Sequence, residues 1–153
     1  MTSRASSNLH LLLAGAYTLL ALYGSLYPFS DWRASGVAPF AFLTTGWLRY
    51  TTTFDLVVNA LAYLPFGFLW ATVLSVRRKP AAAFALAALA GSLLSLGVET
   101  VQNFLPSRVP SNLDFASNTL GALIGAAGGL RWGRDLLDGG RLHAWRERRF
   151  LQG

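Results

Sequence analysis

Four long apolar runs constrain this sequence more than any other feature. A helix needs roughly 20 apolar residues to cross a hydrocarbon core about 30 Å thick. The runs cover about residues 9–27, 55–76, 81–105 and 114–132. They are rich in Leu and Ala without strong alternation, which predicts helices, whose backbone polar groups are satisfied internally. We therefore expect an all-α membrane protein: one membrane domain over residues 1–153, with a bundle of about four transmembrane helices.

The basic residues divide unequally between the two sides that these spans would define. Lys and Arg in short flanking segments collect on the cytoplasmic side of a membrane. Ten of the thirteen Lys and Arg residues fall on one side: Arg4, Arg77, Arg78, Lys79, Arg131, Arg134, Arg141, Arg146, Arg148 and Arg149. The other side receives Arg33, Arg49 and Arg108. This split predicts that both termini are cytoplasmic and that residues 133–153 form a basic cytoplasmic tail on an anionic leaflet.

Composition excludes several other classes of protein. Charged residues make up 13% of the chain, against about 25% in an ordinary soluble domain. Because the basic residues lie between or beyond apolar runs, there is no basic face of the kind that binds nucleic acid. The absence of cysteine excludes disulfides, thiolate metal sites and a cysteine nucleophile. No small-x-small cleavage pattern follows the first run, so we expect it to remain as a span.

The connection between the first two spans, residues 28–54, is long and rich in aromatic residues. Aromatic side chains of this kind sit at membrane–water interfaces. They are Phe29, Trp32, Phe40, Phe42, Trp47 and Tyr50. An interfacial anchor is the favoured interpretation, and a lid over a site is the alternative.

Small residues recur every four positions in the fourth span, at Ser117, Gly121, Gly125 and Gly129. Such a stripe lets another helix approach closely. The third span carries a shorter stripe at Ala87, Gly91 and Ser95, which predicts a tight hairpin between these two spans.

Pro65 lies near the middle of the second span. A proline there removes a backbone hydrogen bond and bends the helix.

Polar residues that a membrane should exclude gather near the non-cytoplasmic ends of three spans. The second and fourth spans each carry an Asp-x-x-x-Asn pair, and the third carries an acid and an amide beside an arginine in the following loop. The candidate site residues are Asp55, Asn59, Glu99, Gln102, Arg108, Asp114 and Asn118.

Structural explanations compete with functional ones for each of these residues. Asp55 follows Thr52 by three positions and Asp114 follows Ser111 by three, as in capping boxes at helix starts. Asn59 and Asn118 can be hydrogen-bonding contacts between helices. Glu99 lies near a helix C-terminus, where the dipole opposes its charge, so it is the strongest functional candidate. Its structural alternative is an ion pair with Arg108.

Two kinds of ligand suit this set of side chains. Arg108 and two helix N-termini favour an anionic group such as phosphate. The carboxylates of Asp55, Glu99 and Asp114 instead offer oxygen ligands to a divalent cation, which would be the cofactor. In either case Glu99 and Arg108 are the candidate catalytic residues, and the chain is an enzyme only if they act on the bound group.

The ordered polar positions resemble those of the VanZ-like family. They run as Asp55-x3-Asn59-x5-Pro65-x-Gly67, then Glu99-x2-Gln102, then Arg108-x5-Asp114-x3-Asn118-x2-Gly121-x3-Gly125. The resemblance covers about residues 55–129. It implies a multi-pass protein of the bacterial cytoplasmic membrane and, through the family's name, an association with resistance to the glycopeptide teicoplanin. It implies no particular reaction.

Three functional hypotheses follow. The leading one is an outer-leaflet-facing site that binds or acts on a lipid-linked or cell-wall headgroup, with an effect on glycopeptide susceptibility. The alternative is a non-enzymatic scaffold or accessory subunit whose polar cluster only locks helices together. A transporter ranks last, because four spans enclose little pathway and no charge lies deep in the predicted spans.

Overall fold

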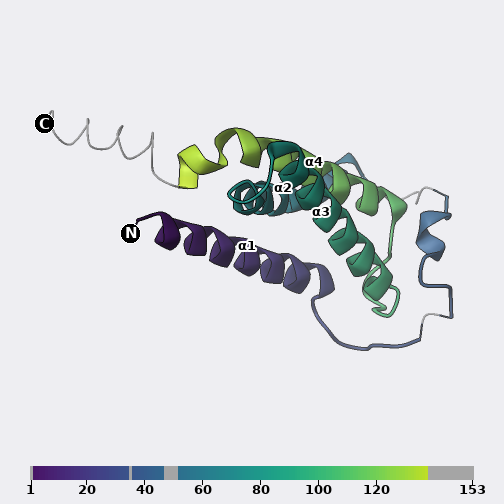
Figure 1. Ribbon diagram of the computed structural model, residues 1–153. Helices are drawn as coiled ribbons and strands as arrows, with labels where there is room; N and C mark the ends of the chain where they lie inside the picture. The colour runs from purple at the N-terminus through teal and green to yellow at the C-terminus, as the bar shows by residue number, and fades with distance from the viewer. Residues whose placement is uncertain (1, 35, 47–51, 138–153) are drawn as a thin grey trace, which may run out of the picture.

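The computed structural model describes residues 2–34, 36–46 and 52–137. Its helices are α1 (Thr2–Leu26), α2 (Thr53–Leu74), α3 (Pro80–Gln102) and α4 (Asn112–Leu137) (Figure 1). A short 3-10 helix, η1 (Ala41–Leu43), lies in the connection between α1 and α2. No strand occurs within the described residues, which confirms the predicted all-α fold. Trp47, Arg49, Tyr50 and the tail beyond residue 137 lie outside them.

Three of these helices are long and apolar enough to cross a membrane: Asn8–Leu26 within α1, Thr53–Leu74 and Pro80–Gln102. The fourth predicted span forms a helix of 26 residues, but it is not among them. Its length suffices, so its composition is the reason, because glycine and polar residues replace large apolar ones along α4. Several glycines of α4 lie against the backbone of the neighbouring helix α2.

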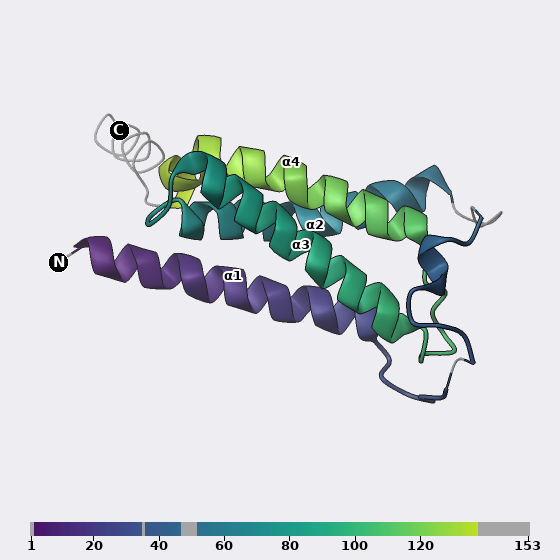
Figure 2. The same ribbon diagram turned by 45° about the vertical axis from the view of Figure 1, so that its right-hand side comes forward.

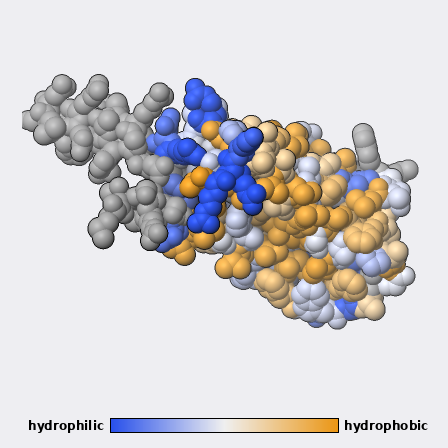
Figure 3. All heavy atoms as spheres, in the orientation of Figure 1, coloured by the Kyte–Doolittle hydropathy of each residue, from blue (hydrophilic) through white to orange (hydrophobic). Residues whose placement is uncertain are grey.

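The helices run along one another, and the start of α1 lies at the same end of the bundle as the end of α4 (Figures 1 and 2). We call this the basic end, because the α2–α3 connection adds the exposed Arg77, Arg78 and Lys79 there. The opposite, polar end is where α1 and α3 finish and α2 and α4 begin. On the face shown in Figure 3, apolar side chains cover the middle of the bundle between the two ends. This surface is what contact with a bilayer requires.

The glycine stripe of α4 packs against α2, not mainly against α3 as predicted, and α2 with α4 forms the most extensive helix pair. A Cβ added to Gly121, Gly125 or Gly129 would overlap the carbonyl oxygen of an α2 residue. Those residues are Ala60, Leu64 and Phe68 in turn, so both sides of the contact advance by four residues. Gly67 of α2 lies equally close to α4, because a Cβ added to it would overlap the Ala122 carbonyl.

Helix α3 does pack against α4 as predicted, but the glycine stripe itself contacts α2, which also carries small residues. Gly91 of α3 also faces α4. A Cβ added to Gly91 would lie 2.5 Å from the Ala122 Cβ, which is a side-chain atom and not backbone. The α2 backbone approaches α4 at every fourth residue, where only glycine leaves room. The helix continues as α-helix through Pro65.

Helix α1 packs more loosely than the others, and polar contacts supply much of its attachment. The Tyr17 hydroxyl donates to the Ala62 carbonyl at 2.8 Å, and Trp70 Nε1 donates to Thr18 Oγ1 at 3.1 Å. Only 11% of its apolar window is buried inside the protein. A helix held in this way leaves space beside it near the polar end.

The connection between α1 and α2 covers the polar end. The Arg33 backbone N–H donates to the Phe104 carbonyl at 3.1 Å, and Asn103 Nδ2 donates to the Pro39 carbonyl at 2.9 Å. Asn112 Nδ2 donates to the Thr45 carbonyl at 2.9 Å, which fixes the later part of the connection to the start of α4. Phe42 is buried, whereas Phe29, Trp32 and Phe40 are exposed as an interfacial anchor would be.

Candidate functional site

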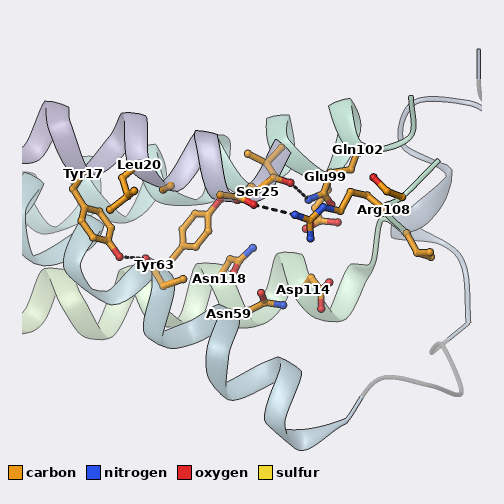
Figure 4. A pocket seen from close by; sticks show the side chains of 16 residues that line it. Tyr17, Leu20, Ser25, Asn59, Tyr63, Glu99, Gln102, Arg108, Asp114 and Asn118 are labelled. Carbon is orange, nitrogen blue, oxygen red and sulfur yellow. Dashed lines mark hydrogen bonds between the residues drawn. The ribbon is translucent and has the colours of Figure 1, made fainter. Parts of the chain in front are cut away.

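A cavity of about 510 Å³ opens between α1 and the α2–α3–α4 bundle at the polar end (Figure 4). Its volume falls in the range of sites that bind small molecules or headgroups. Six of the seven sequence-predicted site residues line it: Asn59, Glu99, Gln102, Arg108, Asp114 and Asn118. We call it the polar cavity.

Glu99 is buried in the wall of this cavity, with 2% of its surface exposed. Its Oε2 accepts a hydrogen bond from the backbone N–H of Ser111 at 2.9 Å. Among the described residues its other oxygen accepts no hydrogen bond. The ion pair with Arg108, which was the structural alternative for Glu99, does not form within the described chain. The carboxylate thus fixes the start of α4 through one oxygen and leaves the second available to a ligand.

The start of α4 shows why Asp114 is free to face the cavity. Ser111 Oγ accepts from the backbone N–H groups of Leu113 and Asp114, at 3.2 and 3.4 Å, as an N-cap does. In a full capping box the side chain three residues later would return a bond to the cap's own N–H. Here the Ser111 N–H donates to the Glu99 carboxylate instead. The capping explanation of Asp114 therefore fails for its carboxylate, which lies beside Asn59 in the cavity wall.

Asp55 behaves in the opposite way. It forms a complete capping box, with Thr52 Oγ1 accepting from the Asp55 N–H at 3.2 Å and Asp55 Oδ2 accepting from the Thr52 N–H at 2.8 Å. Its side chain is exposed and does not line the polar cavity. The structural explanation therefore accounts for Asp55, and the structure separates it from the other candidates.

Arg108 and Gln102 tie the end of α1 to the rest of the bundle. Arg108 Nη2 donates to the carbonyls of Gly24 and Tyr27, both at 3.0 Å, and Nε donates to Tyr27 at 3.3 Å. Gln102 Nε2 donates to the Ser25 carbonyl at 2.9 Å. These carbonyls belong to the last turn of α1 and the residue after it, where carbonyls lack helical partners. Both side chains thus hold the wall that α1 contributes.

The deeper part of the cavity contains buried polar atoms without protein partners. Asn118 Nδ2 donates to Ser95 Oγ at 3.0 Å, but Asn118 Oδ1 is buried and accepts nothing from the described residues. The Tyr63 hydroxyl is also buried; it lies near Ser95 but makes no hydrogen bond of normal geometry with the described residues. Tyr63 and Asn118 are 3% and 4% exposed. Buried polar groups in proteins nearly always have partners, and these two atoms lack one among the described residues.

Several cavity residues escaped the sequence analysis. Tyr63 lies four residues after Asn59, so the helical period could have placed it on the same face. Tyr17 stands out only as a residue with a hydroxyl inside an apolar run. The backbone carbonyls of Gly24, Ser25 and Tyr27 have no sequence signal, because every residue carries one.

The acids do not form a metal centre. Among the described residues, no three carboxylate, histidine or cysteine side chains lie close enough together to hold a metal ion. Asp55, Glu99 and Asp114, the candidate ligand set, are divided between the exposed cap of α2 and the wall of the cavity. The arrangement instead offers hydrogen-bond acceptors and donors to an organic ligand.

Comparison with known proteins gives one match. Residues 6–132 match a family model described as VanZ/LLP1, which covers most of the chain and includes α1 as well as the polar cavity. No curated protein and no solved structure matched the chain.

Proposed function

This chain is a member of the VanZ/LLP1 family of membrane proteins, and we propose that its polar cavity binds the hydroxyl-rich headgroup of a lipid. The observation that carries this is a pair of buried, unpartnered atoms, Tyr63 Oη and Asn118 Oδ1, on residues that line the same cavity as Glu99. Leaving such atoms without partners is costly, and a bound polar group removes that cost.

The mixture of donors and acceptors favours hydroxyl groups. Glu99, Asp114 and Asn118 offer acceptor oxygens, while Asn59 and Tyr63 supply donors. A hydroxyl both donates and accepts, so a sugar or glycerol headgroup can satisfy both kinds of atom at once. A bare anion here would meet two carboxylates, which disfavours it electrostatically.

The mouth of the cavity favours a lipid over a free sugar. Leu20 and Val109 line the cavity and are 61% and 66% exposed, so two exposed apolar side chains lie at its edge. Leu20 belongs to the apolar face of α1, along which acyl chains can lie while the headgroup enters beside Gly24 and Ser25.

We place the polar end at the outer face of the bacterial cytoplasmic membrane, with α4 as a fourth span and both termini inside. The ten-to-three division of basic residues supports this orientation. A protein that holds lipid-linked envelope intermediates at this face would influence the supply of cell-wall precursors. That is how we would explain an effect on glycopeptide susceptibility.

A single cysteine tests both orientation and occupancy, because the chain contains no cysteine of its own. Ser107 is exposed and lines the cavity, and Arg78 is exposed at the basic end. In intact cells a membrane-impermeant maleimide should label a Ser107→Cys variant, and should label Arg78→Cys only after permeabilisation. In detergent, monoglucosyl diacylglycerol should slow labelling of Ser107→Cys, whereas diacylglycerol should not. Labelling of Arg78→Cys first, or equal protection by both lipids, would contradict the proposal.

A structural scaffold is the second candidate, favoured by the Glu99–Ser111 and Asn118–Ser95 hydrogen bonds, which join α3 to α4. In that case the polar residues matter only for stability. The Glu99→Gln variant described in the Discussion separates the two functions.

A further inference from the structure

A second cavity of about 500 Å³ adjoins the polar cavity. It lies between the α1–α2 connection, which contributes Arg33 and Val37, and the α3–α4 connection, which contributes Pro106 and Pro110. Arg108 and Val109 line both cavities, so the two share a wall.

The two cavities differ in charge. Glu99 and Asp114 line the polar cavity, whereas the charged residues that line the second one are Arg33 and Arg108, and no acid is among its lining residues. The Asn103 amide in its wall is already bonded to the Pro39 carbonyl. What the second cavity offers a ligand is therefore mainly positive charge.

Both guanidinium groups keep donors available. Nε and Nη2 of Arg108 bind the carbonyls at the end of α1, which leaves Nη1 without a hydrogen bond among the described residues. The Arg33 side chain is exposed and makes no hydrogen bond within the described part of the chain. Guanidinium groups bind phosphate through charge-assisted, often paired hydrogen bonds.

We propose that the second cavity is a phosphate subsite, which rests on the proposed function: the lipid in the polar cavity carries a phosphate beside its hydroxyl groups. Arg33 and Arg108 bind the phosphate where the two cavities adjoin, at Arg108 and Val109. The charge pattern thus narrows the ligand to a phospholipid with a hydroxylated headgroup.

Native mass spectrometry of the full-length protein in detergent tests this with two probes. Phosphatidylglycerol has a phosphate and hydroxyls, and monoglucosyl diacylglycerol has hydroxyls alone. Arg33→Gln should weaken phosphatidylglycerol binding by about tenfold, the effect of losing a charge-assisted hydrogen bond. Binding of monoglucosyl diacylglycerol should stay unchanged.

Arg77→Gln is the matched control, because Arg77 is exposed at the basic end and its replacement removes the same charge. It should leave the binding of both lipids unchanged. Equal losses of phosphatidylglycerol binding in Arg33→Gln and Arg77→Gln, or no loss in Arg33→Gln, would overturn the phosphate subsite. Failure of the proposed function would look different, because the wild-type protein would then not prefer monoglucosyl diacylglycerol over diacylglycerol.

Discussion

Replacing Glu99 with glutamine should weaken binding of monoglucosyl diacylglycerol by about tenfold or more while the protein stays folded. The glutamine side chain still has an oxygen that can accept the Ser111 N–H, so the start of α4 keeps its hydrogen bond. What the variant loses is the negative charge at the cavity, and hydrogen bonds to charged groups contribute about 1.5–3 kcal/mol. Lipid titration by native mass spectrometry and a thermal melt of the same sample give both readouts.

Asp55→Asn is the control, because it removes the same charge from an exposed carboxylate outside the cavity. Its expected effect is a small loss of stability, because it weakens the cap of α2, with unchanged lipid binding. If Glu99→Gln binds the lipid as tightly as the wild type and only lowers the melting temperature, the polar cluster is a scaffold and the binding function is wrong.

The second large effect is expected from Gly125→Ala, which should destabilise the protein by about 3 kcal/mol. The added methyl would overlap the Leu64 carbonyl, which is backbone and can yield only if α2 and α4 separate. Separation would also loosen the neighbouring contacts at Gly121 and Gly129, which share the same helix pair. Reversible unfolding by sodium dodecyl sulfate in mixed micelles measures this loss.

Gly97→Ala provides the comparison, because nothing lies within 4 Å of the position that its Cβ would take. Alanine favours a helix over glycine by about 1 kcal/mol, so this variant should be as stable as the wild type or slightly more so. Equal destabilisation by both substitutions would show that the close α2–α4 contact is not what the stripe provides.

Much of the fold was predictable because it depends on local properties of the sequence. The apolar runs predicted four helices, and the Thr52–Asp55 spacing predicted the capping box that the structure contains. The partner of the glycine stripe was not predictable in this way. Residue spacing shows which face of a helix carries small side chains. Whether α2 or α3 packs on that face of α4 depends on how the three helices pack together.

The sequence predicted which residues form the candidate site better than it predicted the hydrogen bonds that they make. Six of the seven chosen residues line one cavity, because their positions follow from helix ends that lie at one level. Their bonds involve backbone groups: Glu99 binds the Ser111 N–H, and Arg108 binds the carbonyls of Gly24 and Tyr27. Since every residue has these groups, side-chain identity could not reveal the contacts. It offered an ion pair between Glu99 and Arg108 as the structural alternative, and that pair does not form within the described residues.

The central claim is that the polar cavity recognises hydroxyl groups on a lipid. Its most direct test is the ratio of wild-type affinities for monoglucosyl diacylglycerol and for diacylglycerol with the same acyl chains, measured by native mass spectrometry. The buried, unpartnered Tyr63 hydroxyl and Asn118 carbonyl oxygen, with Glu99 beside them, predict a preference of at least about tenfold for the glucosyl lipid. A ratio near one would contradict the claim, because the headgroup would then gain nothing from the cavity.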